Sequence, residues 1–247
     1  MRRLLRRYQR MRLAWAWLIK SRGVLVWVRL LRPNMVVLDL GANVGYYSFF
    51  ASNKIGPGGR VYAFEPNHEA FSELQRQLPT PRFSNVIMRN TAVSDTSETS
   101  SLHIDPSYSE SGSLYPLPES VNAVAVEVEC VALDDVIHED HVDVVKIDVE
   151  GNEVKALRGM TRILDNNPAI VLYLEINPER LEAANTNVNE LFDLLTEYRF
   201  ELYAIDDRTG KLTLVSTAQV IMQSIEDYGA LNFVASRGHP YAVRSDA

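Results

Sequence analysis

The sequence predicts a doubly wound α/β fold, in which helices cover both faces of a mostly parallel sheet. Beyond Pro33, short apolar runs alternate with helix-like runs, and the first apolar run leads directly into a glycine-rich turn. We expect a seven-stranded sheet, with strands at 36–40, 61–64, 86–92, 142–147, 169–175, 200–205 and 231–235. Helices are expected at 45–55, 68–78, 151–164 and 187–198.

The composition favours one domain, 34–247, preceded by a helical extension, 1–33. A chain of 247 residues with 46% hydrophobic content can bury a large core. The one cysteine, Cys130, excludes an intrachain disulfide, and its setting in "VEVECVAL" is typical of a small core residue on a strand. We therefore expect a cytoplasmic protein.

The extension is strongly basic. Ten of the 25 Lys and Arg residues lie in 1–33, which has no acid, so the remainder has 15 basic and 32 acidic residues. An apolar stripe at helical spacing runs along it, formed by Leu4, Tyr8, Met11, Trp15 and Leu18. This amphipathic helix either packs on the domain or attaches peripherally to an anionic membrane surface, with a partner protein as a third alternative. The acidic body makes nucleic acid an unlikely partner.

The first expected strand and turn, "VVLDLGANVGYYS", predict a small-ligand site. Gly41 and Gly45 bracket Asn43 where the chain turns from strand to helix, and glycine permits positive φ and close approach of a ligand. The amides at the start of the next helix would face that ligand. Asp39 interrupts the apolar run, and its carboxylate could either accept a hydrogen bond from an ammonium group or anchor the turn.

The second strand, "RVYAFEP", ends in Glu65, twenty residues after Gly45. In nucleotide-binding α/β folds an acid at this place accepts hydrogen bonds from ribose hydroxyls. The turn lacks the G-x-G-x-x-G spacing that a pyrophosphate needs, and Asp39 would repel such a group. An amino-acid adenosine such as S-adenosylmethionine therefore fits better than NAD.

Acidic residues follow two later strands. In "VDVVKIDVEGNEVKALRGM" the apolar run ends with Lys146, Asp148 and Glu150, and "AIVLYLEINP" brings Glu175 and Asn177 to the same edge of the sheet. Charges beside a buried run are costly unless they are paired or used. Asp148, Glu175 and Asn177 could hold Mg²⁺, but hydrogen bonding to a substrate hydroxyl explains them equally well, so a metal is not favoured.

An inserted hairpin is expected around 100–132. The stretch 105–122, "DPSYSESGSLYPLPESVN", is rich in Ser, Pro and Tyr and separates the runs "SLHI" and "VAVEVECVAL". It is predicted to be a loop, which is either a surface excursion or a substrate lid.

Together these stretches resemble the FkbM family of S-adenosylmethionine-dependent methyltransferases. The matching pieces span about 34 to 205 and are "VVLDLGANVGYYS", "VYAFEPNHEAF", "NTAVSD", "VVKIDVEGNEVKALRGM" and "LYLEINP". The resemblance implies a class I methyltransferase fold and methylation of hydroxyl oxygens on sugars, polyketides and other metabolites. The basic start and the tail beyond about 236 lie outside it.

The resemblance also implies roles for individual residues. Those implied to hold the methionine portion of the cofactor are Asp39, Gly41, Asn43 and Gly45. Glu65 would bind the ribose, Asn90 and Ala92 would lie near the adenine, and Asp148 and Glu150 would stand at the methyl-transfer end. Glu175 joins them as a catalytic candidate because it follows the next strand.

The predicted function is S-adenosylmethionine-dependent O-methylation of a small-molecule, glycan or lipid-linked hydroxyl. Asp148 or Glu150 would act as the base through hydrogen bonds, with Mg²⁺ as an unfavoured alternative. An NAD-type oxidoreductase, a cofactor-binding module without catalysis and a macromolecule methyltransferase remain as alternatives. The acceptor and the oligomeric state do not follow from the sequence.

Overall fold

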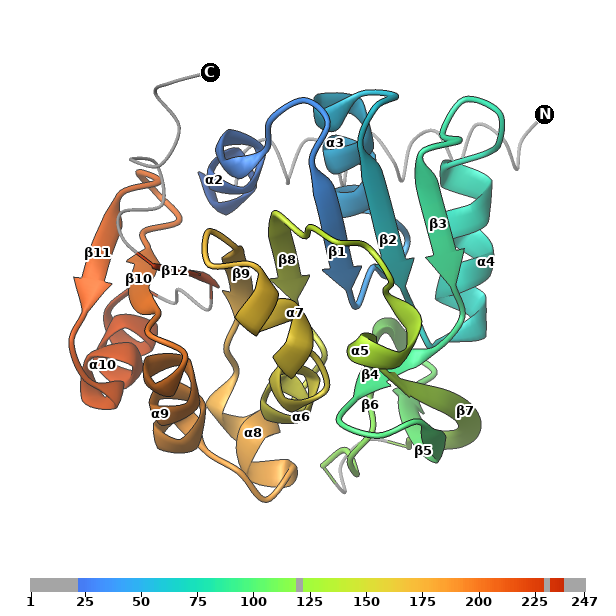
Figure 1. Ribbon diagram of the computed structural model, residues 1–247. Helices are drawn as coiled ribbons and strands as arrows, with labels where there is room; N and C mark the ends of the chain where they lie inside the picture. Colours follow the sequence, from blue (N-terminus) through green and yellow to red (C-terminus); the bar gives the residue numbers. More distant parts are fainter. Residues whose placement is uncertain (1–21, 119–121, 229–231, 238–247) are drawn as a thin grey trace.

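The computed structural model describes residues 22–118, 122–228 and 232–237 (Figure 1). The stripe predicted from Leu4 to Leu18 and the tail beyond 237 lie outside the described residues. Within the described part, no helix is both long and apolar enough to cross a membrane.

The main sheet confirms the doubly wound prediction. Its order is β11-β10-β12-β9-β8-β1-β2-β3, and the five strands β9, β8, β1, β2 and β3 are mutually parallel. The strands are β1 (Val36–Leu40), β2 (Arg60–Phe64), β3 (Val86–Arg89), β8 (Val144–Ile147), β9 (Val171–Glu175), β10 (Glu201–Ile205), β11 (Leu212–Val215) and β12 (Asn232–Ser236). β12 runs antiparallel between β9 and β10.

The expectation of seven strands was one too few among the described residues. The eighth strand, β11, pairs antiparallel with β10 at the edge of the sheet. Its sequence, "LTLV", is short, and Thr213 and Leu214 are exposed. An edge strand with little burial leaves only a weak hydrophobic pattern, so the sequence did not reveal it.

Helices cover both faces of the sheet (Figure 1). One face has α2 (Arg22–Leu30), α3 (Tyr46–Ile55) and α4 (His68–Gln77). The other has α5 (Leu133–Val136), α6 (Glu153–Arg158), α7 (Thr161–Asn166), α9 (Val188–Glu197) and α10 (Ala218–Tyr228), while α8 (Pro178–Ala183) follows β9. The sequence predicted neither α8 nor α10.

The single helix predicted at 151–164 is divided into α6 and α7. Gly159 lies between them, and a Cβ at this position would be 2.0 Å from the carbonyl oxygen of Ser94. The end of α6 therefore packs directly on the backbone of a strand from the second sheet, which requires a glycine there.

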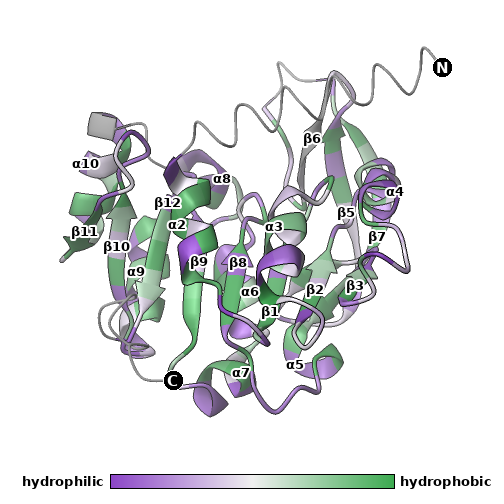
Figure 2. Ribbon diagram, turned by 90° about the horizontal axis from the view of Figure 1, so that it is seen from above, coloured by the Kyte–Doolittle hydropathy of each residue, from purple (hydrophilic) through white to green (hydrophobic). Residues whose placement is uncertain are grey.

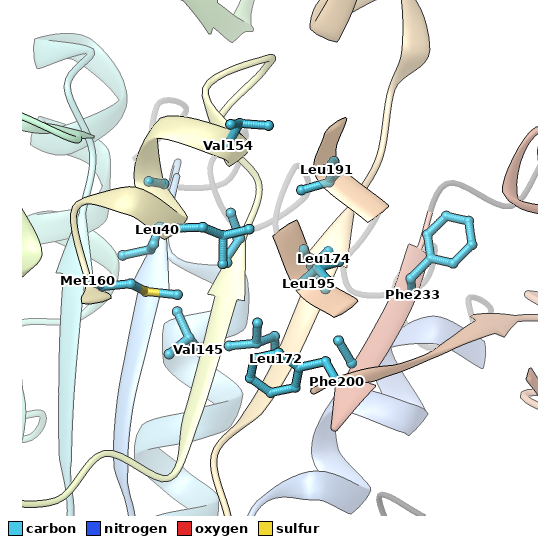
Figure 3. Packing of buried hydrophobic residues seen from close by; sticks show 14 of the residues in the cluster. Leu40, Val145, Val154, Met160, Leu172, Leu174, Leu191, Leu195, Phe200 and Phe233 are labelled. Atoms are coloured by element: carbon cyan, nitrogen blue, oxygen red, sulfur yellow. The ribbon is translucent and has the colours of Figure 1, made fainter. Parts of the chain in front are cut away.

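The core lies on both sides of the main sheet. β1, β2 and β9 are coloured mostly as hydrophobic in Figure 2, and Figure 3 shows how β8 and β9 pack against α6 and α9 through Val145, Val154, Leu172 and Leu191. On the opposite face, the fully buried Trp27 of α2 meets the rings of Tyr47 and Tyr173 edge-on, each at 5.7 Å. The described part of the predicted extension is thus integral to the core.

A second sheet lies beyond the carboxyl ends of β1, β2 and β3 (Figure 1). Its order is β4-β7-β5-β6, with β4 (Ala92–Ser94), β5 (Glu98–Asp105), β6 (Tyr108–Ser113) and β7 (Val124–Ala132). The inserted hairpin is therefore part of a four-stranded sheet, and the stretch predicted to be a loop contributes strand β6.

The prediction of one continuous strand at 86–92 is also wrong. β3 ends at Arg89 in the main sheet, and β4 begins at Ala92 in the second sheet. The Asn90 amide holds this break by donating to the carbonyl oxygens of Glu65 at 2.8 Å and Pro66 at 3.0 Å. A side chain that bonds to backbone acceptors competes with continuation of the strand.

Candidate active site

The predicted site residues gather at the carboxyl ends of β1, β2, β8 and β9, which are neighbours in the sheet. Two parts can be distinguished. The glycine-turn side comprises residues 39–45 together with Glu65. The acidic side comprises Asp148, Glu150, Glu153 and Glu175.

The glycine turn touches the acidic side through the backbone. Gly41 has φ +76°, and a Cβ there would be 1.8 Å from the carbonyl oxygen of Asp148. Asn43 and Gly45 also have positive φ, at 50° and 95°. The sequence predicted glycine for the approach of a ligand, and the structure adds that Gly41 allows the chain after β1 to lie against the chain after β8.

Glu65 lies against the glycine turn and is only 7% exposed. Its Oε2 accepts a hydrogen bond from the backbone N–H of Asn43 and its Oε1 from that of Asn67, both at 2.8 Å. Burial raises the pKa of the Glu65 carboxyl to about 7, against the effect of these two donors. Each oxygen keeps a further lone pair for a ligand hydroxyl, so the ribose role stays a prediction that this geometry permits.

Asp39 is fully buried beneath the turn. Its Oδ2 accepts a hydrogen bond from the Ser48 hydroxyl at 2.6 Å, and its Oδ1 lies 3.8 Å from Nζ of Lys146. Burial raises the pKa of the Asp39 carboxyl, although the Lys146 charge opposes this. Of the two roles considered for Asp39, this placement favours anchoring the turn over contact with a ligand ammonium.

Lys146 joins the two sides. The sequence indicated that Lys146, Asp148 and Glu150 would be paired or used, but not that Lys146 reaches the glycine turn. Its Nζ lies 2.8 Å from Oδ2 of Asp148 and 3.3 Å from the carbonyl oxygen of Gly41, and 4.7 Å from the centroid of the Tyr47 ring. Burial lowers the pKa of this ammonium, but the charges of Asp148 and Asp39 raise it more. The charged residue inside an otherwise apolar strand was the available signal.

The acidic side brings together the three catalytic candidates. Asp148 pairs with Lys146, and Oε2 of Glu150 lies 3.1 Å from Nε of Arg180. Burial, followed by the charge of Asp148, raises the pKa of Glu175 to about 8 and also raises the pKa of Glu150. These carboxyl groups share one small region, and they cannot all be ionised there without mutual repulsion.

Glu153 is a member of the acidic side that the sequence reasoning treated only as a helix residue. It is 3% exposed, and its Oε1 accepts hydrogen bonds from the backbone N–H groups of Val149 at 3.4 Å and Gly151 at 3.2 Å. Burial raises its pKa to about 7. A glutamate at the third position of the helix expected at 151–164 was the signal that could have found this loop-closing role.

The remaining predicted residues are engaged in local structure. Asn90 holds the chain after β3 beside Glu65, and Ala92 is buried in β4. The Asn177 amide oxygen accepts hydrogen bonds from the first two backbone N–H groups of α8, at 3.1 and 3.3 Å, so it caps that helix. Within the described residues no group of three or more His, Cys, Asp or Glu side chains could hold a metal ion.

Residues 39–202 match the family model described as the methyltransferase FkbM domain. The chain belongs to the FkbM methyltransferase family. This confirms the resemblance seen in the sequence, and the mixed sheet with helices on both faces is the Rossmann-like fold of class I methyltransferases.

Curated relatives of this FkbM-family chain include two named methyltransferases. Methyltransferase sdnD of Sordaria araneosa is 28% identical over an alignment of 161 residues, and the match covers 53% of this chain and 62% of the relative. Hexuronic acid methyltransferase AglP of Haloferax volcanii is 27% identical over 134 residues, which is 53% of this chain and 52% of the relative. The chain thus spans little more than half the length of these relatives.

Among solved structures, the chain is similar to methyltransferase FkbM from Methylobacillus flagellatus KT. The identity is 15%, the TM-score is 0.49, and the match covers 82% of this chain and 43% of that one.

Proposed function

We propose that this FkbM-family chain transfers a methyl group from S-adenosylmethionine to a hydroxyl oxygen of a small molecule or glycan. The observation that carries the proposal is the placement of three acidic candidates, Asp148, Glu150 and Glu175, beside the glycine turn and Glu65, with Lys146 between the two sides. The proposed adenosine site and a group of proton-accepting oxygens would thus be adjacent.

The residues of the glycine-turn side fit the proposed cofactor. Glu65 would accept hydrogen bonds from the ribose hydroxyls, and the backbone of Gly41, Asn43 and Gly45 would hold the methionine portion over the buried Asp39 anchor. Asn90 and Ala92 would border the adenine. When bound, S-adenosylmethionine supplies a methyl group on a positively charged sulfur.

The acidic side would prepare the acceptor. An alcohol is a weak nucleophile until its proton is accepted, and the most effective base has a pKa near the working pH. Glu175, with its pKa raised to about 8, meets this condition. We therefore assign Glu175 the role of the general base that accepts the proton of the acceptor hydroxyl. Asp148 and Glu150, which are held by Lys146 and Arg180, would orient the hydroxyl through hydrogen bonds.

The test uses S-adenosylmethionine with an isotopically labelled methyl group and a panel of hydroxylated acceptors, including hexuronic acid glycosides because of the relative AglP. The expected product is a methyl ether, which is stable to mild base, whereas a methyl ester would be cleaved. An ester or an N-methyl product would contradict hydroxyl methylation. Loss of activity with a chelator, restored by Mg²⁺, would instead support a metal on Asp148 and Glu175.

Binding measurements separate this proposal from the other classes. Calorimetry with S-adenosylhomocysteine and with NAD is expected to give binding of the first only, because the turn lacks the spacing for a pyrophosphate. Binding of S-adenosylhomocysteine without any transfer to hydroxyl acceptors would favour a cofactor-binding module.

A further inference from the structure

The loop from Asp148 to Asn152, which carries two of the catalytic candidates, has an unfavourable backbone. Glu150 has φ 51° and Gly151 has φ 105°. A glutamate rarely adopts the left-handed region, so surrounding contacts must hold it there. Gly151 adds a steric constraint, because a Cβ there would be 2.5 Å from the carbonyl oxygen of Arg180.

Some of the contacts that hold the loop come from α6, the helix that follows it. The buried carboxylate of Glu153 accepts hydrogen bonds from the backbone N–H groups of Val149 and Gly151, one on each side of Glu150. These bonds fix the N–H groups of the loop but leave the carbonyl oxygen of Glu150 and the side chain of Asn152 to other partners.

Those other partners come from the second sheet and from the chain just after β6. The Ser113 hydroxyl, at the end of β6, donates to the carbonyl oxygen of Glu150 at 2.7 Å, and the Tyr115 hydroxyl donates to Oδ1 of Asn152 at 2.7 Å. Asn152 is 1% exposed, and its Nδ2 donates to the carbonyl oxygen of Val93 in β4 at 2.7 Å. The second sheet and the chain just after β6 therefore hold both Glu150 and Asn152, the residues on either side of Gly151, through hydrogen bonds.

We propose that the second sheet holds the Asp148–Asn152 loop in its working conformation, with Ser113 and Tyr115 as positioning residues for Glu150. The contacts themselves are independent of the proposed function, and the inference rests on that function only where it gives Glu150 a part in methyl transfer. The segment inserted in this domain would then set the geometry of the acidic side as well as border the acceptor.

The charges around Glu150 make its titration a sensitive report of the loop. Arg180 of α8 and Lys146 of β8 lower the pKa of Glu150, while burial and Asp148 raise it, and Glu175 of β9 lies in the same cluster. Release of the loop would expose the Glu150 carboxyl to water and so bring its pKa down toward the ordinary range.

The test compares the full chain with the double variant Ser113→Ala/Tyr115→Phe, which removes two hydroxyl groups. Hydrogen exchange of the Gly151 and Asn152 amides is expected to accelerate about tenfold or more, because two holding bonds are lost. The ¹³C titration of the Glu150 carboxyl, assigned with Glu150→Gln, should shift to lower pH. Affinity for S-adenosylhomocysteine should stay within about twofold, since the glycine-turn side is untouched.

The matched control is Ser107→Ala/Tyr198→Phe. The Ser107 hydroxyl donates to Asp105 in the same hairpin, and the Tyr198 hydroxyl donates to Thr161, so these two bonds do not involve the loop. This variant should leave the exchange and the titration unchanged. If the double variant does not fold, Tyr115→Phe alone gives the same comparison with one hydroxyl removed.

Unchanged exchange and titration in a folded variant would overturn the proposal, and so would equal changes in the control. Failure of the proposed function would look different. In that case the unaltered protein would either fail to bind S-adenosylhomocysteine or bind its cofactor without methylating a hydroxyl acceptor. The loop measurements, which need neither cofactor nor acceptor, would still respond to Ser113 and Tyr115.

Discussion

Glu65 is buried and Glu175 is half-buried, and both carboxyls have raised pKa values, but their surroundings differ. Glu65 accepts two backbone hydrogen bonds, from Asn43 and Asn67, at the turn between strand and helix. Glu175 lies among the charges of Asp148, Glu150 and Glu153, with Lys146 as the nearest compensation. Burial raises the pKa of both carboxyls. Backbone donors oppose this rise at Glu65 and hold its carboxylate in place for binding, whereas the neighbouring carboxylates add to the rise at Glu175 and suit that group to proton transfer.

Lys146 makes this contrast possible because it touches both sides. It stabilises the buried Asp39 under the glycine turn and the half-exposed Asp148 of the acidic side. The four predictions below test whether the two sides are as distinct as their contacts indicate.

The largest effect is expected from Lys146→Met, which removes the cation shared by both sides. It leaves Asp39 buried without its counter-charge, and loss of one partner of a buried pair costs about 3–5 kcal/mol. Urea denaturation at neutral pH should show a fall of this size in the free energy of unfolding. The control Lys54→Met changes an exposed lysine on α3 and should have little effect.

The double variant Lys146→Met/Asp39→Asn should regain part of the lost stability, because the asparagine is neutral and can still accept the Ser48 hydrogen bond. If the double variant is no more stable than Lys146→Met, the buried charge on Asp39 is not the cause of the loss.

Glu175→Gln separates catalysis from binding. Removal of a general base lowers turnover by roughly 10²–10⁴-fold, while affinity for S-adenosylhomocysteine should change by no more than a few fold because Glu65 is intact. Turnover is measured with the hydroxyl acceptor found in the panel. Normal turnover would show that Glu175 is structural and would move the role of base to Asp148 or Glu150.

Glu65→Ala should have the opposite pattern. Hydrogen bonds to a charged group contribute about 1.5–3 kcal/mol each, so affinity for S-adenosylhomocysteine should fall about tenfold or more. Calorimetry measures this, with the exposed Glu69→Ala on α4 as the control. Undiminished affinity would remove Glu65 from the cofactor site and with it the distinction between the two sides.

The last prediction concerns how stability depends on pH. Glu175 has a pKa of about 8 in the folded chain against 4.5 as the ordinary value, so the folded state keeps a proton that the unfolded state releases. Its contribution to stability is therefore full below pH 4.5 and is lost as pH rises toward 8. Thermal denaturation of Glu175→Gln should show a smaller decline over this window. An unchanged decline would mean that Glu175 titrates normally.

The sequence by itself determined the elements that depend on neighbouring residues. Buried parallel strands are continuous apolar runs, and a glycine turn or an acid after such a run marks the carboxyl end of the strand. The sequence therefore placed β1, β2, β8 and β9, with Gly41, Glu65, Asp148 and Glu175 at one edge of the sheet. The family resemblance followed from the same stretches and was confirmed.

Only the tertiary structure decided the contacts between segments far apart in the chain. The break between β3 and β4 depends on Asn90 reaching back to Glu65, and the division of the helix at Gly159 depends on the approach of Ser94. The hydrogen bonds from Ser113 and Tyr115 to the Asp148–Asn152 loop likewise each join residues 37 positions apart. Local patterns record burial and backbone preference, but such hydrogen bonds form only when folding brings the partners together, and they leave no periodic signal in the sequence.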